Sequence, residues 1–153
     1  MNLAFIPLSW VLVSVLSLSI QSPESKLENF NPDQEQVEKG LVLLQKHCYS
    51  CHNPASPSHD EMLAPPLVGI KSHYQKAYPE SKDFKAAMIG FVSDPNEEKG
   101  IMKGPMKRFG VMPKPPVPEE EIKLIVEYIH ANQLEEPSWF KEHHKGNGNP
   151  NNH

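Results

Sequence analysis

The stretch DQEQVEKGLVLLQKHCYSCH, residues 33–52, decides how this chain folds and which group it holds. Val37, Leu41 and Leu44 recur at helical spacing, so the first part of the stretch predicts an amphipathic helix that begins near Asp33. The last five residues form a Cys-x-x-Cys-His motif, which is the attachment signature of a c-type haem. We therefore expect a helix that runs directly into a cofactor site.

Cys48, Cys51 and His52 supply the three chemical groups that such a site needs. Residues three apart on a helical turn share a face, so both thiols can reach the two vinyl groups of one porphyrin and become thioethers. The adjoining imidazole of His52 is placed to bind the iron as the proximal ligand. The motif therefore predicts one covalently bound haem c, with its iron, attached to Cys48 and Cys51 and ligated by His52.

Two other kinds of site also use a Cys-x-x-Cys pair. A thioredoxin-like dithiol needs a βαβ context, and no stretch of this sequence shows convincing strand alternation. A structural zinc site takes four Cys or His ligands, usually from two paired clusters, but both cysteines of the chain lie inside the one motif. The haem interpretation is therefore favoured over both alternatives.

The composition fits one soluble globular domain. Of the 153 residues, 38% are hydrophobic and 22% are charged, and the mean hydropathy is −0.52. The formal net charge of −4 excludes the global basic field that nucleic-acid binding requires. The 16 prolines, roughly twice the usual share, predict helices separated by stiff loops.

The N-terminal run LAFIPLSWVLVSVLSLSI, residues 3–20, is uncharged and mostly apolar. It ends at Ser17-Leu18-Ser19, a small-x-small cleavage pattern, so residues 1–22 are interpreted as a secretory signal peptide. The run also approaches the ~18 residues of a membrane span, which leaves an N-terminal anchor as the alternative. Both interpretations predict a periplasmic or otherwise extracytoplasmic protein, associated with a membrane only if the run is retained.

The rest of the chain divides into three parts. Residues 23–32 are polar with little periodicity and are expected to form a linker. Residues 33–136 carry the helical patterns and are expected to form an all-α domain. Residues 137–153 end in GNGNPNNH, which cannot bury a core, so they are expected to form a mostly disordered C-terminal extension.

Three further helices are expected after a proline-rich loop at residues 53–66. They run from Leu67 to about Tyr74, over Phe84–Val92 up to Asp94-Pro95, and from Pro118 and Glu119 through Ile129. Residues 96–116, rich in Gly, Pro, Lys and Met, are expected to form a long loop between the last two helices.

These features together resemble class I cytochrome c, a small all-α monohaem electron carrier. The resemblance is carried by the Cys-x-x-Cys-His motif, by Gly40 eight residues before it, and by the stretch APPLVG at residues 64–69. It implies three to five helices wrapped around one covalently bound haem, with Tyr128 of the last helix packed on Gly40. It also implies that the carbonyl of Pro65 accepts a hydrogen bond from the ring of His52, which orients this ligand.

The sixth iron ligand is expected to be a methionine. Met62 lies too close after the motif, and Met88 is better explained as a core residue of its helix. The remaining methionines share the loop at residues 96–116; they are Met102, Met106 and Met112. Because FGVMP at residues 109–113 resembles the family's G-x-M-P loop, the resemblance implies Met112, with Met106 and Met102 as the alternatives.

An iron saturated by His52 and Met112 has no open position for oxygen chemistry, so the expected function is one-electron transfer rather than enzymatic catalysis. The expected apolar pocket and core are formed by Leu44, Leu67, Phe84, Met88, Phe91, Ile125 and Ile129. Two alternatives stay open: a fixed electron-relay subunit of a larger oxidoreductase, held by the N-terminal run or by Trp139 and Phe140, and a haem enzyme or gas sensor with a labile sixth ligand.

The expected partners are redox proteins, acidic where they dock. Five positive residues and no acidic ones lie between residues 99 and 118; the positive residues are Lys99, Lys103, Lys107, Arg108 and Lys114. A positive rim around the haem edge would steer an acidic partner, and a merely solvated loop is the alternative. His47 and His59 are expected to be solvated surface groups.

Overall fold

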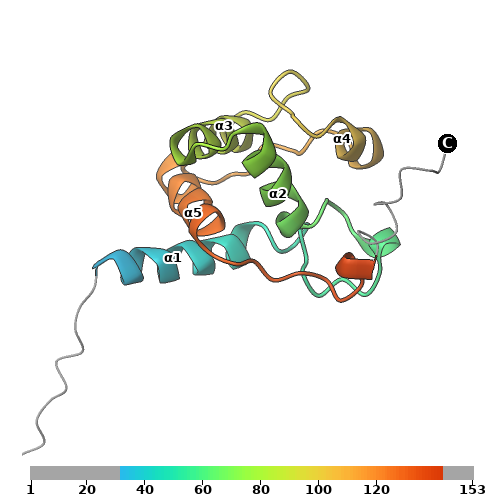
Figure 1. Ribbon diagram of the computed structural model, residues 1–153, viewed down its shortest axis with the longest axis horizontal. Coiled ribbons are helices and arrows are strands. Elements are labelled where there is room, and N and C mark those ends of the chain that lie inside the picture. The colour runs from blue at the N-terminus through green and yellow to red at the C-terminus, as the bar shows by residue number, and fades with distance from the viewer. Residues whose placement is uncertain (1–31, 143–153) are drawn as a thin grey trace, which may run out of the picture. The chain divides into compact units, whose positions relative to one another are not determined.

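The computed structural model describes residues 32–142, and these residues are entirely helices and loops (Figure 1). The helices are α1 (Pro32–His47), the single 3₁₀ turn η1 (His59–Glu61), α2 (Leu67–Ala77), α3 (Ser81–Ser93), α4 (Lys103–Phe109) and α5 (Glu119–Ala131). The all-α prediction is confirmed for this part of the chain. The predicted signal or anchor at residues 1–22, and the predicted linker up to residue 31, lie outside the described residues.

None of the helices between residues 32 and 142 has the length and apolarity needed to cross a membrane. The apolar run at residues 3–20 is outside this search.

Helix α5 forms the centre of the fold. It begins after Pro118 with Glu119, Glu120 and Glu121, whose carboxylates suit the positive end of the helix dipole. Four of its apolar residues recur at helical spacing and are at most 5% exposed; they are Ile122, Ile125, Val126 and Ile129. This stripe packs against α1 and α3, so α5 connects these two helices.

The crossing of α1 and α5 depends on a glycine. A Cβ placed on Gly40 would lie 2.6 Å from the backbone oxygen of Leu124 and 2.8 Å from Cβ of Tyr128. Both distances are shorter than side-chain contacts allow, so only glycine lets the two helix backbones approach this closely. The expected packing of Tyr128 on Gly40 is therefore present, and Figure 1 shows α5 lying across α1.

Helices α2 and α3 complete the core. Phe84 and Met88 of α3 are 1% and 3% exposed, and they pack with Tyr74 of α2 and Leu44 of α1. Helix α3 ends at Ser93, directly before Asp94-Pro95, as the sequence predicts. The four helices α1, α2, α3 and α5 thus bury one continuous apolar cluster.

The prediction of an uninterrupted loop over residues 96–116 is wrong, because α4 lies inside it. The sequence KGPMKRF contains Gly104 and Pro105, which are usually helix breakers. Pro105 is the third residue of α4, in the first turn, where the N–H that proline lacks would have no acceptor within the helix. Gly110 ends the helix, and its N–H donates to the carbonyl of Met106 at 2.9 Å.

The chain after α5 also packs more closely than expected. Pro137 is among the most deeply buried side chains, and Phe140 lies beside Gly69 at the start of α2. Residues 137–142 are therefore packed against the domain, and the disorder expected of GNGNPNNH at the end of the extension stays a prediction. Residues 143–153 lie outside the described part of the chain.

Replacing Gly40 by alanine should destabilise the protein by about 1–3 kcal/mol, because the backbone oxygen of Leu124 cannot move away without shifting α5. Gly90 of α3 is the matched control, since a Cβ there has nothing within 4 Å. Gly90→Ala should stabilise the protein by about 0.5–1 kcal/mol through helix propensity. Denaturant unfolding measures both changes, and equal stability of the two variants would contradict the tight crossing.

Candidate functional site

A cavity of about 470 Å³ opens between the Cys-x-x-Cys-His motif and the segment that contains α4. Small-molecule and cofactor sites usually occupy about 300–1,000 Å³, so the cavity is large enough for a cofactor. All five residues that the sequence assigns to cofactor binding line it, namely Cys48, Cys51, His52, Pro65 and Met112. The rest of the wall is mainly apolar and comes from residues 100–117, which include α4, and from α2, α3 and α5.

The two cysteines stand on one helical turn that continues α1. The N–H of Cys51 and the N–H of His52 both donate to the carbonyl of Cys48, at 3.1 and 2.9 Å. Cys48 is half-buried, Cys51 is exposed, and both carry free thiols. Burial, with a smaller contribution from Cys51, raises the pKa of the Cys48 thiol to about 11, so this thiol is protonated at neutral pH.

His52 is oriented by a hydrogen bond to the backbone. Its Nδ1 lies 2.7 Å from the carbonyl oxygen of Pro65, and because a carbonyl can only accept, Nδ1 must carry the proton. Burial lowers the pKa of His52, partly opposed by this hydrogen bond, so the neutral imidazole is favoured. A neutral ring protonated at Nδ1 has Nε2 available as a metal ligand.

The carbonyl of Pro65 is available because the next residue begins α2. Pro66 is the N-cap, and its own carbonyl accepts from the N–H groups of Gly69 and Ile70, at 3.0 and 3.1 Å. The first intrahelical hydrogen bonds of α2 are therefore accepted by the carbonyl of Pro66, and the carbonyl of Pro65 is left to accept from His52. Neither proline has an N–H to satisfy at this point.

Three methionines line the cavity from the segment around α4, namely Met102, Met106 and Met112. Met106 is packed against Gly100: a Cβ on Gly100 would overlap its Sδ and lie 2.7 Å from its Cε. Met88 reaches the cavity wall from α3, whereas Met62 is buried without lining the cavity. The structure thus keeps the same three methionines as candidates for the sixth iron ligand as the sequence does. The thioether of one of them, Met106, is packed against Gly100.

The residues expected in the apolar pocket and core divide into two layers, one at the cavity and one behind it. Leu44 and Phe84 are 0% and 1% exposed and belong to the core cluster, but neither lines the cavity. The other expected residues do line the cavity, namely Leu67, Met88, Phe91, Ile125 and Ile129. Periodicity identifies the buried face of a helix, but it cannot separate the layer at the cavity from the layer behind it.

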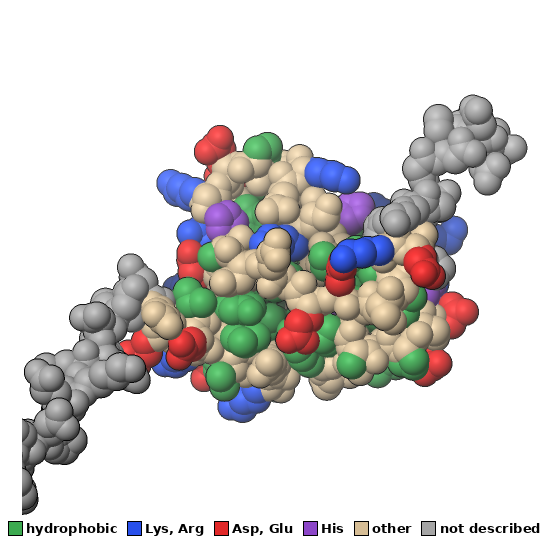
Figure 2. Space-filling view, turned by 60° about the horizontal axis from the view of Figure 1, so that its bottom comes forward, with side chains coloured by type: hydrophobic (Ala, Val, Ile, Leu, Met, Phe, Trp, Pro, Cys, Tyr) green, Lys and Arg blue, Asp and Glu red, His purple; other side chains and the backbone are tan. Residues whose placement is uncertain are grey.

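The positive stretch at residues 99–118 meets acidic residues that precede it in the sequence. Lys99 pairs with Asp94 at 2.5 Å, and Arg108 pairs with Asp60 at 3.0 Å. Among the described residues, Lys107 and Lys114 form no salt bridge, and Lys103 donates to the backbone oxygen of Glu97. On the face seen in Figure 2, Lys and Arg side chains likewise alternate with Asp and Glu side chains.

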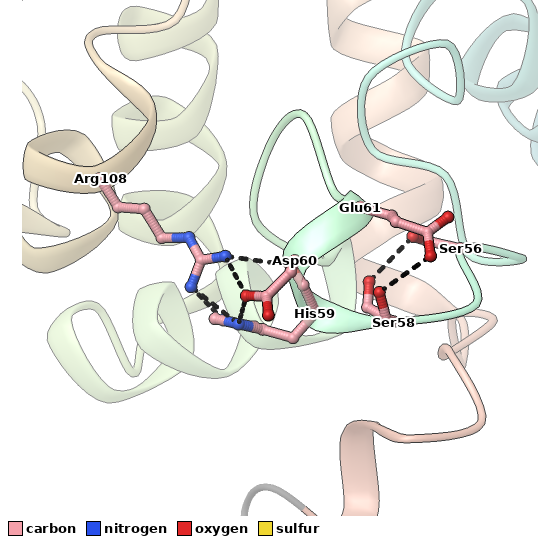
Figure 3. Close-up of polar contacts among 6 residues, drawn as sticks. All are labelled: Ser56, Ser58, His59, Asp60, Glu61 and Arg108. Atoms are coloured by element: carbon pink, nitrogen blue, oxygen red, sulfur yellow. Dashed lines mark hydrogen bonds and ion pairs between the residues drawn. The ribbon is translucent and has the colours of Figure 1, made fainter.

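Arg108 ties α4 to the turn η1 (Figure 3). Its Nη1 lies 2.7 Å from Nδ1 of His59, and its Nη2 donates to Asp60 Oδ1 at 3.0 Å and to the carbonyl of His59 at 3.2 Å. The hydrogen bond from Arg108 to Asp60, with a smaller contribution from His59, holds the pKa of Asp60 below its usual range. His59 therefore lies at the surface, with its side chain 37% exposed, but it is held by Arg108, which the sequence does not predict.

His47 is likewise engaged, because its Nε2 lies 3.0 Å from Glu121 Oε2 and its side chain is only 17% exposed. The pair joins the end of α1 to the start of α5, next to the motif. Neither histidine could be assigned from the sequence, because their partners are 74 and 49 residues away.

Comparison with known proteins agrees with this geometry. The family model described as Cytochrome c matches residues 37–133. An uncharacterized protein of Aquifex aeolicus (strain VF5) is 28% identical over 136 residues, which cover 78% of this chain and 88% of that protein. No solved structure matches the chain significantly.

Tyr74, in the cavity wall, should make stability fall at high pH. Burial, with a smaller contribution from Tyr78, raises its pKa from 10 to about 12. The unfolded chain loses this proton near pH 10 and the folded chain near pH 12, so the free energy of unfolding should fall between these values, by up to about 2 kcal/mol.

Denaturant unfolding below pH 10 and near pH 12 measures this loss. Tyr74→Phe should lose less stability than the wild type over that range, whereas Tyr78→Phe, the change on the neighbouring ring, should keep most of the loss. The same pH dependence in the wild type and Tyr74→Phe would contradict the assignment.

Proposed function

The chain belongs to the cytochrome c family, whose members use haem c for electron transfer, and from this we propose that it is a one-electron carrier with a single haem attached to Cys48 and Cys51. When bound, the haem iron takes up and releases one electron as it alternates between Fe(II) and Fe(III). The residues of this chain fix the position, the ligands and the surroundings of that iron. We propose that His52 and Met112 would bind this iron, since both line the cavity.

The observation that best supports the proposal is the 2.7 Å hydrogen bond between His52 and Pro65. It holds a neutral imidazole beside two free thiols on one helical turn, at the wall of a cavity of about 470 Å³. A dithiol site for redox exchange has no use for a histidine held in this tautomer, whereas an axial ligand requires it.

Met112 is favoured as the distal ligand by the position of Met106. The thioether of Met106 is packed against Gly100, so it contributes to the packing between α4 and the segment before it. Met112 lies beyond Gly110 in a stretch that forms no helix, and it lines the cavity. A thioether is a soft ligand that favours the reduced iron, and the apolar wall disfavours the extra charge of the oxidised iron.

Carbon monoxide binding tests the distal assignment. The reduced wild-type protein should resist carbon monoxide, and the oxidised protein should show the weak long-wavelength band of methionine-ligated iron. Met112→Ala should lose that band and bind carbon monoxide, whereas Met106→Ala and Met102→Ala should keep the wild-type spectrum. Loss of the band in Met106→Ala instead would move the ligand to that residue, and a wild type that binds carbon monoxide readily would favour a haem enzyme or gas sensor.

The carrier function also predicts simple redox behaviour. A reductive titration of the wild-type protein should take one electron per chain and follow a one-electron Nernst curve. Further electrons per chain would contradict a single haem.

We propose that this carrier works outside the cytoplasm, on the basis of the apolar run at residues 3–20. A fixed relay subunit could be held by the same run. The other tether considered for it, Trp139 and Phe140, contacts its own chain, since Trp139 Nε1 donates to the carbonyl of Ser56 at 2.9 Å. This contact leaves the run at residues 3–20 as the tether of a fixed relay subunit, which stays the alternative to a mobile carrier.

The docking surface is proposed to lie at the edge of the cavity. Leu63 is 70% exposed and lines the cavity, as does Lys114. Lys99 and Arg108 are neutralised by their carboxylate partners, so the attraction of an acidic partner falls mainly to Lys103, Lys107 and Lys114. Such steering raises association rates and weakens with ionic strength.

Electron transfer to an anionic oxidant, hexacyanoferrate(III), measures this steering. The double variant Lys107→Gln/Lys114→Gln should slow the reaction severalfold at low salt and flatten its salt dependence. The control Lys85→Gln/Glu127→Gln removes a neutral pair that does not line the cavity and should leave both unchanged. Equal behaviour of the two double variants would remove the support for a positive docking surface.

A further inference from the structure

The C-terminal segment, residues 133–142, lies almost wholly beyond the part of the chain that matches the cytochrome c family. Figure 1 shows it running from the end of α5 back beside the loop that follows α1. It contacts that loop and the start of α2, which are the two stretches that flank Pro65. Its position therefore bears on the hydrogen bond that orients His52.

The segment is fixed where it leaves α5. Lys71 of α2 donates through Nζ to the carbonyls of His130 and Asn132, at 3.0 and 2.7 Å. A cation at these carbonyls suits the negative end of the helix dipole. Pro137, further along, is fully buried, so the backbone is held at two points before it reaches the loop.

The far end of the segment holds the loop at residues 53–66. The indole Nε1 of Trp139 donates to the backbone oxygen of Ser56 at 2.9 Å, and Ser56 is only 5% exposed. The ring of Trp139 also meets the ring of His59 edge-on, with centroids 5.5 Å apart. Phe140 lies beside Gly69, so the two neighbouring aromatic residues contact the chain on both sides of Pro65.

The loop has little structure of its own to fix it. Only the short turn η1 interrupts it, and four prolines remove backbone donors, namely Pro54, Pro57, Pro65 and Pro66. Its internal hydrogen bonds are local: Ala55 and Ser56 bond to Asn53, and Ser58 bonds to Glu61. Near Pro65 the loop is held by the start of α2 at Pro66 and by the burial of Met62 and Ala64, and its earlier part depends on contacts from other elements.

Two such contacts can be compared, one from Trp139 and one from Arg108. The carboxylate of Asp60 that Arg108 binds is 91% exposed, and exposed ion pairs contribute little. The hydrogen bond from Trp139 reaches a buried residue and is accompanied by the burial of Pro137. Trp139 therefore holds the loop at residues 53–66 more strongly than Arg108 does.

We propose that Trp139 is a positioning residue for His52: it holds the loop at residues 53–66 so that the Pro65 carbonyl stays on Nδ1 of the imidazole. The inference rests on the proposed function, because it takes His52 as the iron ligand. The C-terminal segment then acts on the cofactor without touching it, through Ser56, Pro65 and the ring of His52.

Trp139→Phe tests the role, because it keeps an aromatic ring and removes only the N–H donor. In the reduced, haem-loaded protein, NMR can follow hydrogen exchange of the His52 ring N–H and of the loop amides. Loss of one hydrogen bond should make both exchange about five- to tenfold faster, while amides in α1 and α5 stay unchanged. Phe140→Leu, at the other side of Pro65, should accelerate the same ring proton.

Lys141→Ala is the matched control, since its ion pair among residues 32–142 is with Glu136 of the same segment and its side chain is 74% exposed. It should leave exchange at His52 unchanged. Unchanged exchange in Trp139→Phe, whatever Phe140→Leu does, would overturn the positioning role of Trp139. Equal acceleration in α1 and α5 would also overturn it and leave a general effect on stability. A wild-type protein without haem absorption would refute the proposed function itself, so the two failures are distinguishable.

Discussion

The hydrogen bond from His52 Nδ1 to the Pro65 carbonyl is the interaction on which the site depends. It selects the tautomer of the imidazole, and it joins the motif at the end of α1 to the start of α2 across a proline-rich loop. The close crossing of α1 and α5 at Gly40 supports this hydrogen bond, because it fixes the direction of α1 and so the positions of Cys48, Cys51 and His52 at its end. The cavity is lined by the residues whose positions depend on this hydrogen bond and on the crossing at Gly40.

Much of this arrangement is readable from the sequence because its signals are local or periodic. The buried stripe of α5 follows from the spacing of Ile122, Ile125, Val126 and Ile129. The motif at residues 48–52 identifies its own chemistry, and the positions of Gly40 and Pro65 follow from the resemblance to cytochrome c. In each case a few residues close together, or a regular spacing, carry the information.

The features that the sequence does not reveal depend on distant partners or on position within a helix. Pro105 reads as a breaker, yet in the first turn of α4 it costs no hydrogen bond. The charge of Arg108 is matched by Asp60, 48 residues earlier, and Trp139 bonds to Ser56, 83 residues earlier. No local pattern indicates such pairs, so the sequence alone reveals neither the carboxylate partners of Lys99 and Arg108 nor the packing of residues 137–142.

The intact mass of the mature protein tests the central claim most directly, when it is produced together with a haem-attachment system and measured under denaturing conditions. A single haem bonded to Cys48 and Cys51 predicts that the wild-type chain weighs one haem more than its amino acids. The matched Cys48→Ser/Cys51→Ser variant should weigh no more than its own residues. A colourless wild-type protein with the mass of its polypeptide alone would contradict the haem site and the electron carrier built on it.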